Sequence, residues 1–265
     1  MRAYRIAYDG RPFHGFQRQP DVRTVEDELL AALSRLGVAD QRVPEGYAAA
    51  GRTDAGVSAL AQTVAFEAPD WLSPAAFNSE LPASVRAWAS ANVPASFHAQ
   101  YDATERRYTY HLHAPDADDE RARAALTALS GEQDFHNLTP DDEGTVRELS
   151  THLSRDGEFL VVALTAGGFC RQLVRRVVGL VAEIARGQRD LSFADRVRST
   201  ESLEGPDGVA PAPAHPLVLT DVLYPGVEFA VDADARESAR EVFADLRATR
   251  AAGARVAGTI RDGLA

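Results

Sequence analysis

The sequence predicts an α+β protein made of two similar halves with mostly antiparallel sheets. Two observations indicate this class. A strand, a helix and an antiparallel pair of strands follow one another in the first hundred residues, and the same order recurs in the second hundred. A chain of 265 residues also fits one large domain or two of ordinary size. We therefore expect three regions: an N-terminal domain over 1–100, a C-terminal domain over 101–225 and an acidic helical tail over 226–265.

The first half opens with alternating apolar side chains in residues 2–10, which predict a strand that ends in a turn. Residues 24–37 predict a helix, because Thr24 fits an N-cap, apolar residues follow at helical spacing and Gly37 fits a stop. Further strands are expected at 45–50, 60–68 and 85–93, and a short helix at 73–81.

The second half begins with an alternating strand at 105–114 and a helix at 116–131. Residues 145–168 predict a hairpin that turns at Asp156-Gly157, and 169–187 predict a strongly periodic helix. A linker or binding loop rich in proline and glycine follows at 205–216. A late strand at 217–224 and an acidic surface helix from about Asp232 complete the chain.

The charge of the chain is unusual. The net charge is −11 at pH 7, and all 28 basic residues are arginine. Such a composition indicates adaptation to concentrated salt, and it disfavours a nucleic-acid partner unless a basic surface is local. No apolar run approaches a membrane span and the start lacks the pattern of a signal peptide, so we expect a cytoplasmic protein. The one cysteine, Cys170, excludes an internal disulfide.

One charged pair stands between two expected strands. Arg52 and Asp54 are framed by Gly51 and Gly56 in the stretch AAAGRTDAGVSAL. A lone aspartate in such a loop is most often structural, because its side chain forms an Asx-turn. The two glycines, however, let a ligand approach the backbone, and arginine can stack on bases or clamp phosphate.

The segment GRTDAGVSA, residues 51–59, resembles the signature of the TruA family of tRNA pseudouridine synthases. Other segments resemble family motifs in the same order, so that the resemblance spans about residues 4–224. These segments are AYDGRPFHGFQRQP (7–20), FHAQYDATERRYTYHL (97–112), GEQDFHNL (131–138), GGFCRQLVRRVVGL (167–180) and, in a weakened form, APAHPLVL (212–219).

The resemblance implies the pseudouridine synthase fold, in which the two halves join into one larger sheet flanked by helices. It also implies isomerisation of uridine to pseudouridine in the anticodon arm of tRNA, at positions 38 to 40, without cofactor or metal. The expected partner is tRNA, bound by a homodimer. Trapping a flipped base while its glycosidic bond breaks and re-forms needs a nucleophile or a stabilising charge in a closed pocket.

The resemblance also implies site residues. Asp54 matches the catalytic nucleophile, and Arg175 matches the cation that pairs with it. Tyr108 matches an aromatic residue that stacks on the uracil and is a candidate for proton removal from C5. Arg52 matches the residue that helps to extrude the base, and Leu173 a residue that packs against it. The sequence alone also fits a solvated Arg175, a strand tyrosine and a core leucine.

Phosphate contacts are expected from arginines that flank the motifs and supply the local basic surface. These are Arg11, Arg18, Arg106, Arg107, Arg171 and Arg176.

The chain departs from the family motifs at a few places: Ser58 stands where a histidine is common, His215-Pro216 where an acidic or polar residue and glycine are usual, and Cys170 to Leu173 where Leu-His-His-Met is frequent.

Two other readings stay open. The first is a noncatalytic RNA-binding protein on the same fold, against which the combination of Asp54, Tyr108 and Arg175 argues. The second is a hydrolase with an aspartate nucleophile, which would need a metal cluster or a second acidic residue. His111 and His113 share a strand face but have no third ligand at a suitable spacing, so we expect no metal site.

Overall fold

The computed structural model describes residues 1–39, 43–203 and 205–264. The strands are β1 (Arg2–Tyr8), β2 (Ala48–Ala49), β3 (Ser58–Phe66), β4 (Val85–Asn92), β5 (Glu105–His113), β6 (Gly131–Asp134), β7 (Val146–Asp156), β8 (Phe159–Ala166), β9 (Leu217–Leu223) and β10 (Ala230–Val231). The helices are α1 (Val25–Arg35), α2 (Pro74–Asn78), α3 (Asp119–Ala128), η1 (His136–Leu138), α4 (Leu173–Ala185), α5 (Phe193–Val197), η2 (Gly205–Asp207) and α6 (Ala233–Asp262).

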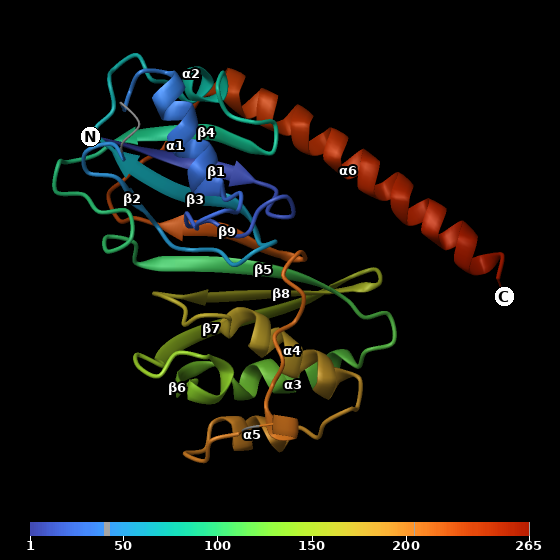
Figure 1. Cartoon of the computed structure of the whole chain (residues 1–265). Helices are drawn as coiled ribbons and strands as arrows, with labels where there is room; N and C mark the ends of the chain where they lie inside the picture. The colour runs from blue at the N-terminus through green and yellow to red at the C-terminus, as the bar shows by residue number, and fades with distance from the viewer. Residues whose placement is uncertain (40–42, 204, 265) are drawn as a thin grey trace.

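The strands form one sheet that runs through both halves (Figure 1). Its order is β10-β4-β1-β3-β9-β5-β8-β7-β6, and β2 pairs with β3. Only the β3–β9 pair among those described is parallel. Strand β9, which is late in the chain, lies between β3 of the first half and β5 of the second. The predicted fold class is therefore confirmed, and β9 is the strand that joins the halves.

Each half has its own core, with helices against the sheet (Figure 1). In the second half, α3 and α4 cover the inner face, where Tyr110 and Leu112 of β5 are buried while His111 and His113 are exposed. This alternation follows from the two-residue repeat of a strand. The first part of the expected tail region, 226–265, packs on the first half of the protein, because β10 pairs with β4 and α6 lies against β4 and α2.

Several local predictions are confirmed. Thr24 caps α1, because its hydroxyl accepts a hydrogen bond from the backbone N–H of Asp27 at 3.3 Å. Gly37 follows the helix with a φ of 70°, a value that favours glycine. The β7–β8 hairpin turns at Asp156 and Gly157 as expected.

Two predicted boundaries are wrong. The helix expected over 169–187 begins only at Leu173, because Gln172 has a left-handed backbone with a φ of 61°. The strand expected over 45–50 shrinks to the two residues of β2. None of the helices in the described ranges is long and apolar enough to cross a membrane.

Candidate active site

Asp54 lies in a tight turn between β2 and β3. Its backbone carbonyl accepts a hydrogen bond from the N–H of Val57 at 3.1 Å, and Gly56 adopts a φ of 81° within the turn. Such a φ favours glycine because a side chain would meet the backbone. The sequence Asp-Ala-Gly-Val thus folds into a turn that presents the aspartate side chain, which is 32% exposed.

The segment after β1 packs closely against this turn. A Cβ on Gly10 would lie 2.1 Å from the carbonyl oxygen of Val57, so only glycine allows this approach. A Cβ on Gly15 would likewise lie 2.9 Å from the carbonyl oxygen of Thr53. The hydroxyls of Thr53 and Tyr8 form a hydrogen bond of 2.7 Å. Residues far apart in the sequence therefore fix the backbone on both sides of Asp54.

Arg175 of α4 reaches this turn from the other half of the molecule. Its Nη1 donates to Oδ2 of Asp54 at 3.0 Å, and its Nε donates to the carbonyl of Ala212 at 2.8 Å. The guanidinium is 17% exposed and is therefore largely shielded from solvent. An arginine held at two points orients the carboxylate opposite it. The predicted pairing of Arg175 with Asp54 is present in the structure.

The loop that carries Ala212 is fixed against α4. The N–H of Ala212 donates back to the carbonyl of Arg175 at 2.9 Å. A Cβ on Gly179 would lie 2.4 Å from the carbonyl oxygen of Ala210, so glycine permits this close contact. The stretch rich in proline and glycine is thus a wall of the site rather than a free linker.

Tyr108 stands on β5 between the two cores and packs against both. Its ring meets Phe169 edge to face, with ring centroids 5.2 Å apart. Burial raises the pKa of Tyr108 to about 12, Arg106 acts to lower it, and the negative charge of Asp54 adds to the rise. The phenol is therefore neutral near pH 7. It can stack on a base and donate a hydrogen bond, whereas removing a proton would first require the phenol to lose its own.

Known proteins with similar sequences place this geometry in a family. The family model described as tRNA pseudouridine synthase matches residues 125–225. A tRNA pseudouridine synthase A of Haloarcula marismortui is 62% identical, with 100% of each chain covered, and one of Natronomonas pharaonis is 64% identical over 98% of each. One of Archaeoglobus fulgidus is 39% identical over 87% of this chain and 86% of the relative. The chain belongs to the tRNA pseudouridine synthase family.

Among solved structures, the crystal structure of an archaeal box H/ACA sRNP Nop10-Cbf5 complex resembles the chain weakly. The TM-score is 0.37 at 13% identity, covering 69% of this chain and 43% of that one. So low a score carries no conclusion about function.

In this chain, Arg106 is a structural residue. Its guanidinium donates to the carbonyls of Ala50 at 2.8 Å and Gln100 at 2.6 Å, and also to that of Gly167. Burial lowers the pKa of Arg106, while Tyr224 and Tyr108 act to raise it. Since protein carbonyls occupy its donors, Arg106 links the two halves beside the site and is not available to a phosphate.

Three other predicted phosphate-binding arginines have protein partners. Arg176 donates to the carbonyl of Val209 at 2.6 Å, which adds a second tie between α4 and the loop. Arg18 pairs with Asp27 at 2.9 Å and Arg171 with Asp141 at 3.2 Å, both at the surface. Exposed pairs of this kind contribute little stability, so these two arginines can exchange their partner for a phosphate.

The remaining predicted arginines are open to solvent. Arg11 and Arg52 are exposed, and within the described part of the chain their side chains form no hydrogen bond or ion pair. Arg107 is also exposed, and its Nε donates to the hydroxyl of Thr165 at 3.3 Å. Among the described residues, these three side chains are thus held weakly or not at all by protein partners.

Two side chains beside the site have positions that the sequence did not predict. Leu173, the first residue of α4, is fully buried in the core of the second half, so it supports the site from inside. Phe169, which the sequence reading did not single out, forms the edge-to-face contact with Tyr108. Its position after two glycines and just before α4 is the only sequence signal for it.

Ser58 and His113 have other partners. The hydroxyl of Ser58 accepts a hydrogen bond from the N–H of Gly10 at 3.0 Å. Ser58 therefore links the start of β3 to the segment that follows β1. His113 lies 3.5 Å from Glu158. No group of three or more metal-ligating side chains is present among the described residues.

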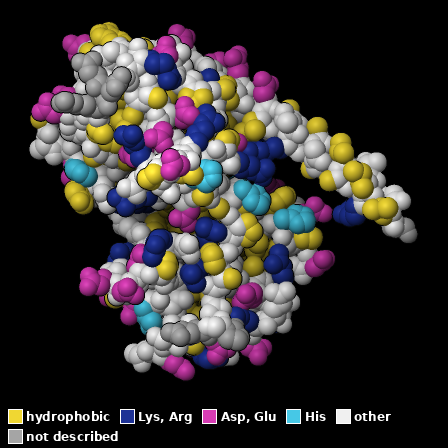
Figure 2. Space-filling model, in the orientation of Figure 1, with side chains coloured by type: hydrophobic (Ala, Val, Ile, Leu, Met, Phe, Trp, Pro, Cys, Tyr) yellow, Lys and Arg dark blue, Asp and Glu magenta, His cyan; other side chains and the backbone are white. Residues whose placement is uncertain are grey.

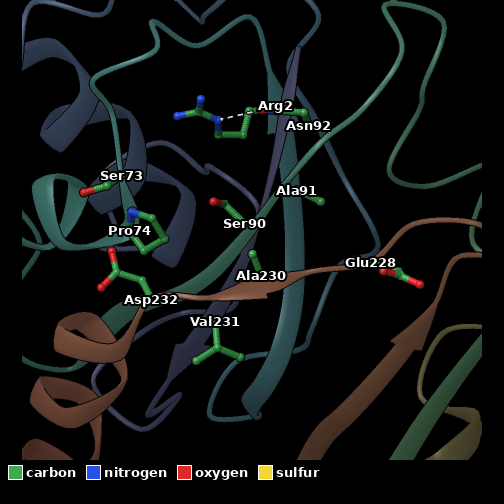
Figure 3. Close-up of a pocket in the computed structure, with 10 residues that line it drawn as sticks. All are labelled: Arg2, Ser73, Pro74, Ser90, Ala91, Asn92, Glu228, Ala230, Val231 and Asp232. Atoms are coloured by element: carbon green, nitrogen blue, oxygen red, sulfur yellow. Dashed lines mark hydrogen bonds between the residues drawn. The ribbon is translucent and has the colours of Figure 1, made fainter.

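A hollow of about 410 Å³ lies between β4, β10 and the start of α6 (Figure 3). Several of its polar groups are already paired, because Arg2 donates to Asn92 at 3.1 Å and Asp232 accepts from the N–H of Ala75 at 3.1 Å and of Ala235 at 3.0 Å. Arg2 begins β1, whereas the strand's other end leads to the turn that carries Asp54, about 20 Å away. This hollow is therefore a structural junction, remote from Asp54.

Proposed function

We propose that the protein isomerises uridine to pseudouridine in the anticodon stem-loop of tRNA, at positions 38 to 40, with Asp54 as its nucleophile and no cofactor. The observation that carries this proposal is the 3.0 Å ion pair between Asp54 and Arg175, which joins a loop of one half to a helix of the other. Membership of the tRNA pseudouridine synthase family supports the reaction class.

The reaction needs no redox step. The bond between C1′ and N1 of uridine breaks while the Asp54 carboxylate adds to C1′ or stabilises the positive charge there. The freed uracil rotates, and C5 then bonds to C1′. The hydrogen at C5 leaves as a proton and N1 gains one, so substrate and product are isomers.

The side chains around Asp54 suit these steps. Arg175 keeps the carboxylate oriented while substrate covers it and excludes water. Tyr108, supported by Phe169, offers a ring on which uracil can stack. The exposed Arg52, two residues from Asp54, is placed to fill the gap that a flipped base leaves. Arg11 and Arg107 supply phosphate contacts. The family resemblance further suggests a cytoplasmic homodimer.

The test is release of tritium from unmodified tRNA that carries 5-tritiated uridine, measured in several molar KCl. Wild type should release tritium and Asp54→Asn should not. Asp116→Asn, an exposed aspartate in the second half, is the matched control and should behave as wild type. Release by Asp54→Asn would show that another group is the nucleophile. Binding of tRNA by wild type without release would favour a noncatalytic RNA-binding protein.

A further inference from the structure

The second half of helix α6 extends past the body of the protein. The first half of α6 packs against β4 and α2, with Ala235 and Ala239 buried. Beyond Leu246 the side chains are exposed, and Figure 1 shows the end of the helix standing away from the sheet. The helix extends about 18 Å from Arg250 to Asp262. A helix that leaves its own core in this way has a free surface.

The charge of α6 reverses along its length. From its cap to Asp245 the helix carries five acidic residues against two arginines. From 246 to 261 it carries four arginines and no acidic residue, in a chain with 39 acidic residues overall. These arginines are Arg247, Arg250, Arg255 and Arg261. The basic half of α6, defined as residues 246–261, is therefore a positive segment on an otherwise acidic protein.

The basic half of α6 begins beside the catalytic turn. Nη2 of Arg250 lies 2.7 Å from Oδ2 of Asp9, whose side chain is only 8% exposed. Asp9 directly precedes Gly10, the residue that contacts Val57 in the turn. Because a shielded charge pair constrains direction, this contact sets where α6 passes the site.

A small basic hollow lies beside the turn that carries Asp54. A cavity of about 410 Å³ is lined by Arg11, Gly56, Ala214 and His215. Burial lowers the pKa of His215, and the positive charges of Arg11 and Arg250 lower it further. Arg11 and Arg250 thus both lie near His215, although they come from opposite ends of the chain. Figure 2 shows basic and histidine side chains gathered where α6 meets the body.

We propose that the basic half of α6 is an arm that binds the phosphate backbone of the tRNA, continuing the basic surface that Arg11 begins beside the catalytic turn. This inference rests on the proposed function, which supplies the polyanion. Arginines spread along an exposed helix fit a row of phosphates, each contacted separately. The ion pair of Arg250 with Asp9 positions the arm relative to Asp54.

The test compares two double variants on the same helix. Arg247→Gln with Arg255→Gln removes two exposed charges from the basic half of α6. Arg236→Gln with Arg240→Gln removes two exposed charges from the acidic half and is the control. The dissociation constant for unmodified tRNA is measured by filter binding over a series of KCl concentrations.

The first variant should bind more weakly, and its slope of log Kd against log salt should fall by about 2 relative to wild type, since each lost phosphate contact lowers it by about 1. The control should keep the wild-type slope. The tRNA concentration that half-saturates tritium release should rise in the first variant and stay at the wild-type value in the control, because the arm binds substrate and does not touch the reacting atoms.

Equal slopes for wild type and the first variant would overturn the proposal. The proposal would also be overturned if light scattering showed a dimer for wild type and a monomer for the first variant. The exposed Val256 and Ile260, four residues apart, would then contact a second copy of the chain. Loss of slope in the first variant together with no tritium release by wild type would leave the arm standing and refute the proposed reaction.

Discussion

Arg175 and Asp54 lie 121 positions apart in the sequence and 3.0 Å apart in the structure. Replacing Arg175 by Gln should lower the rate of tritium release on the order of 10²-fold, the usual effect of losing one oriented donor at a reaction centre. The melting temperature should also fall, because Arg175 is largely shielded from solvent and the carbonyl of Ala212 loses its donor. Arg186→Gln, at the far end of α4, is the control. A normal rate for Arg175→Gln would remove the ion pair from the mechanism.

Gly10 controls the position of the catalytic turn. In Gly10→Ala the new methyl group would overlap the carbonyl of Val57, so the turn must shift. We expect loss of about 1–3 kcal/mol of unfolding free energy, as for other overpacked sites, together with reduced activity. Gly168→Ala, where a Cβ meets nothing within 4 Å, should be close to wild type in both. Denaturant titration and tritium release measure the two effects, and an unchanged Gly10→Ala enzyme would contradict the prediction.

Tyr108 should act mainly through its ring. Tyr108→Phe keeps the contact with Phe169 and should retain activity within a few-fold, because a phenol with a pKa of about 12 is neutral at the working pH. Tyr108→Leu removes the ring and should weaken substrate binding by about 1–3 kcal/mol. Single-turnover rates over a range of tRNA concentrations separate binding from chemistry. A severe defect in Tyr108→Phe alone would assign the hydroxyl to proton transfer.

Neighbouring arginines on β5 should differ in kind. Arg106→Gln leaves the carbonyls of Ala50 and Gln100 without this donor and should lower the unfolding free energy by about 1 kcal/mol. Arg107→Gln should leave stability unchanged and lower the salt slope of tRNA binding by about 1. Denaturation and filter binding on both variants check this, and the reverse pattern would show that Arg106 is the phosphate contact.

Buried tyrosines predict a loss of stability in alkali. Burial raises the pKa of Tyr4 and of Tyr224 to about 12, above the value near 10 of an unfolded chain. Their contribution is complete below pH 10 and declines as pH rises to 12, because only the unfolded chain releases these protons. Each should add about 1.4 kcal/mol per pH unit to the slope.

Tyr4→Phe isolates one of these contributions and should make the alkaline decline in unfolding free energy shallower by that amount. Tyr101→Phe, at a residue 76% exposed, should not alter the slope. Denaturant titrations at pH 9, 10, 11 and 12 would provide the comparison. Parallel curves for wild type and Tyr4→Phe would contradict the prediction.

Features that depend on near neighbours in the chain could be predicted from the sequence. The cap of Thr24 on α1 and the hairpin turn at Gly157 each require only a few consecutive residues, and both are present. Short-range hydrogen bonds and turn conformations are encoded locally, which is why the predicted cap and turn are present. The pairing of Asp54 with Arg175 joins distant segments and was expected only from the family resemblance of both.

The tertiary structure alone decided which side chains are free to act. Arg106 and Arg107 are adjacent in the sequence and equally basic, but successive residues of a strand lie on opposite faces. Arg106 therefore contacts backbone carbonyls such as that of Ala50, whereas Arg107 is exposed to solvent. The contact of Arg250 with Asp9 joins residues 241 positions apart, and no local sequence pattern predicts it. Burial and long-range contact depend on how the halves pack around β9, and those decide whether an arginine supports the fold or meets the substrate.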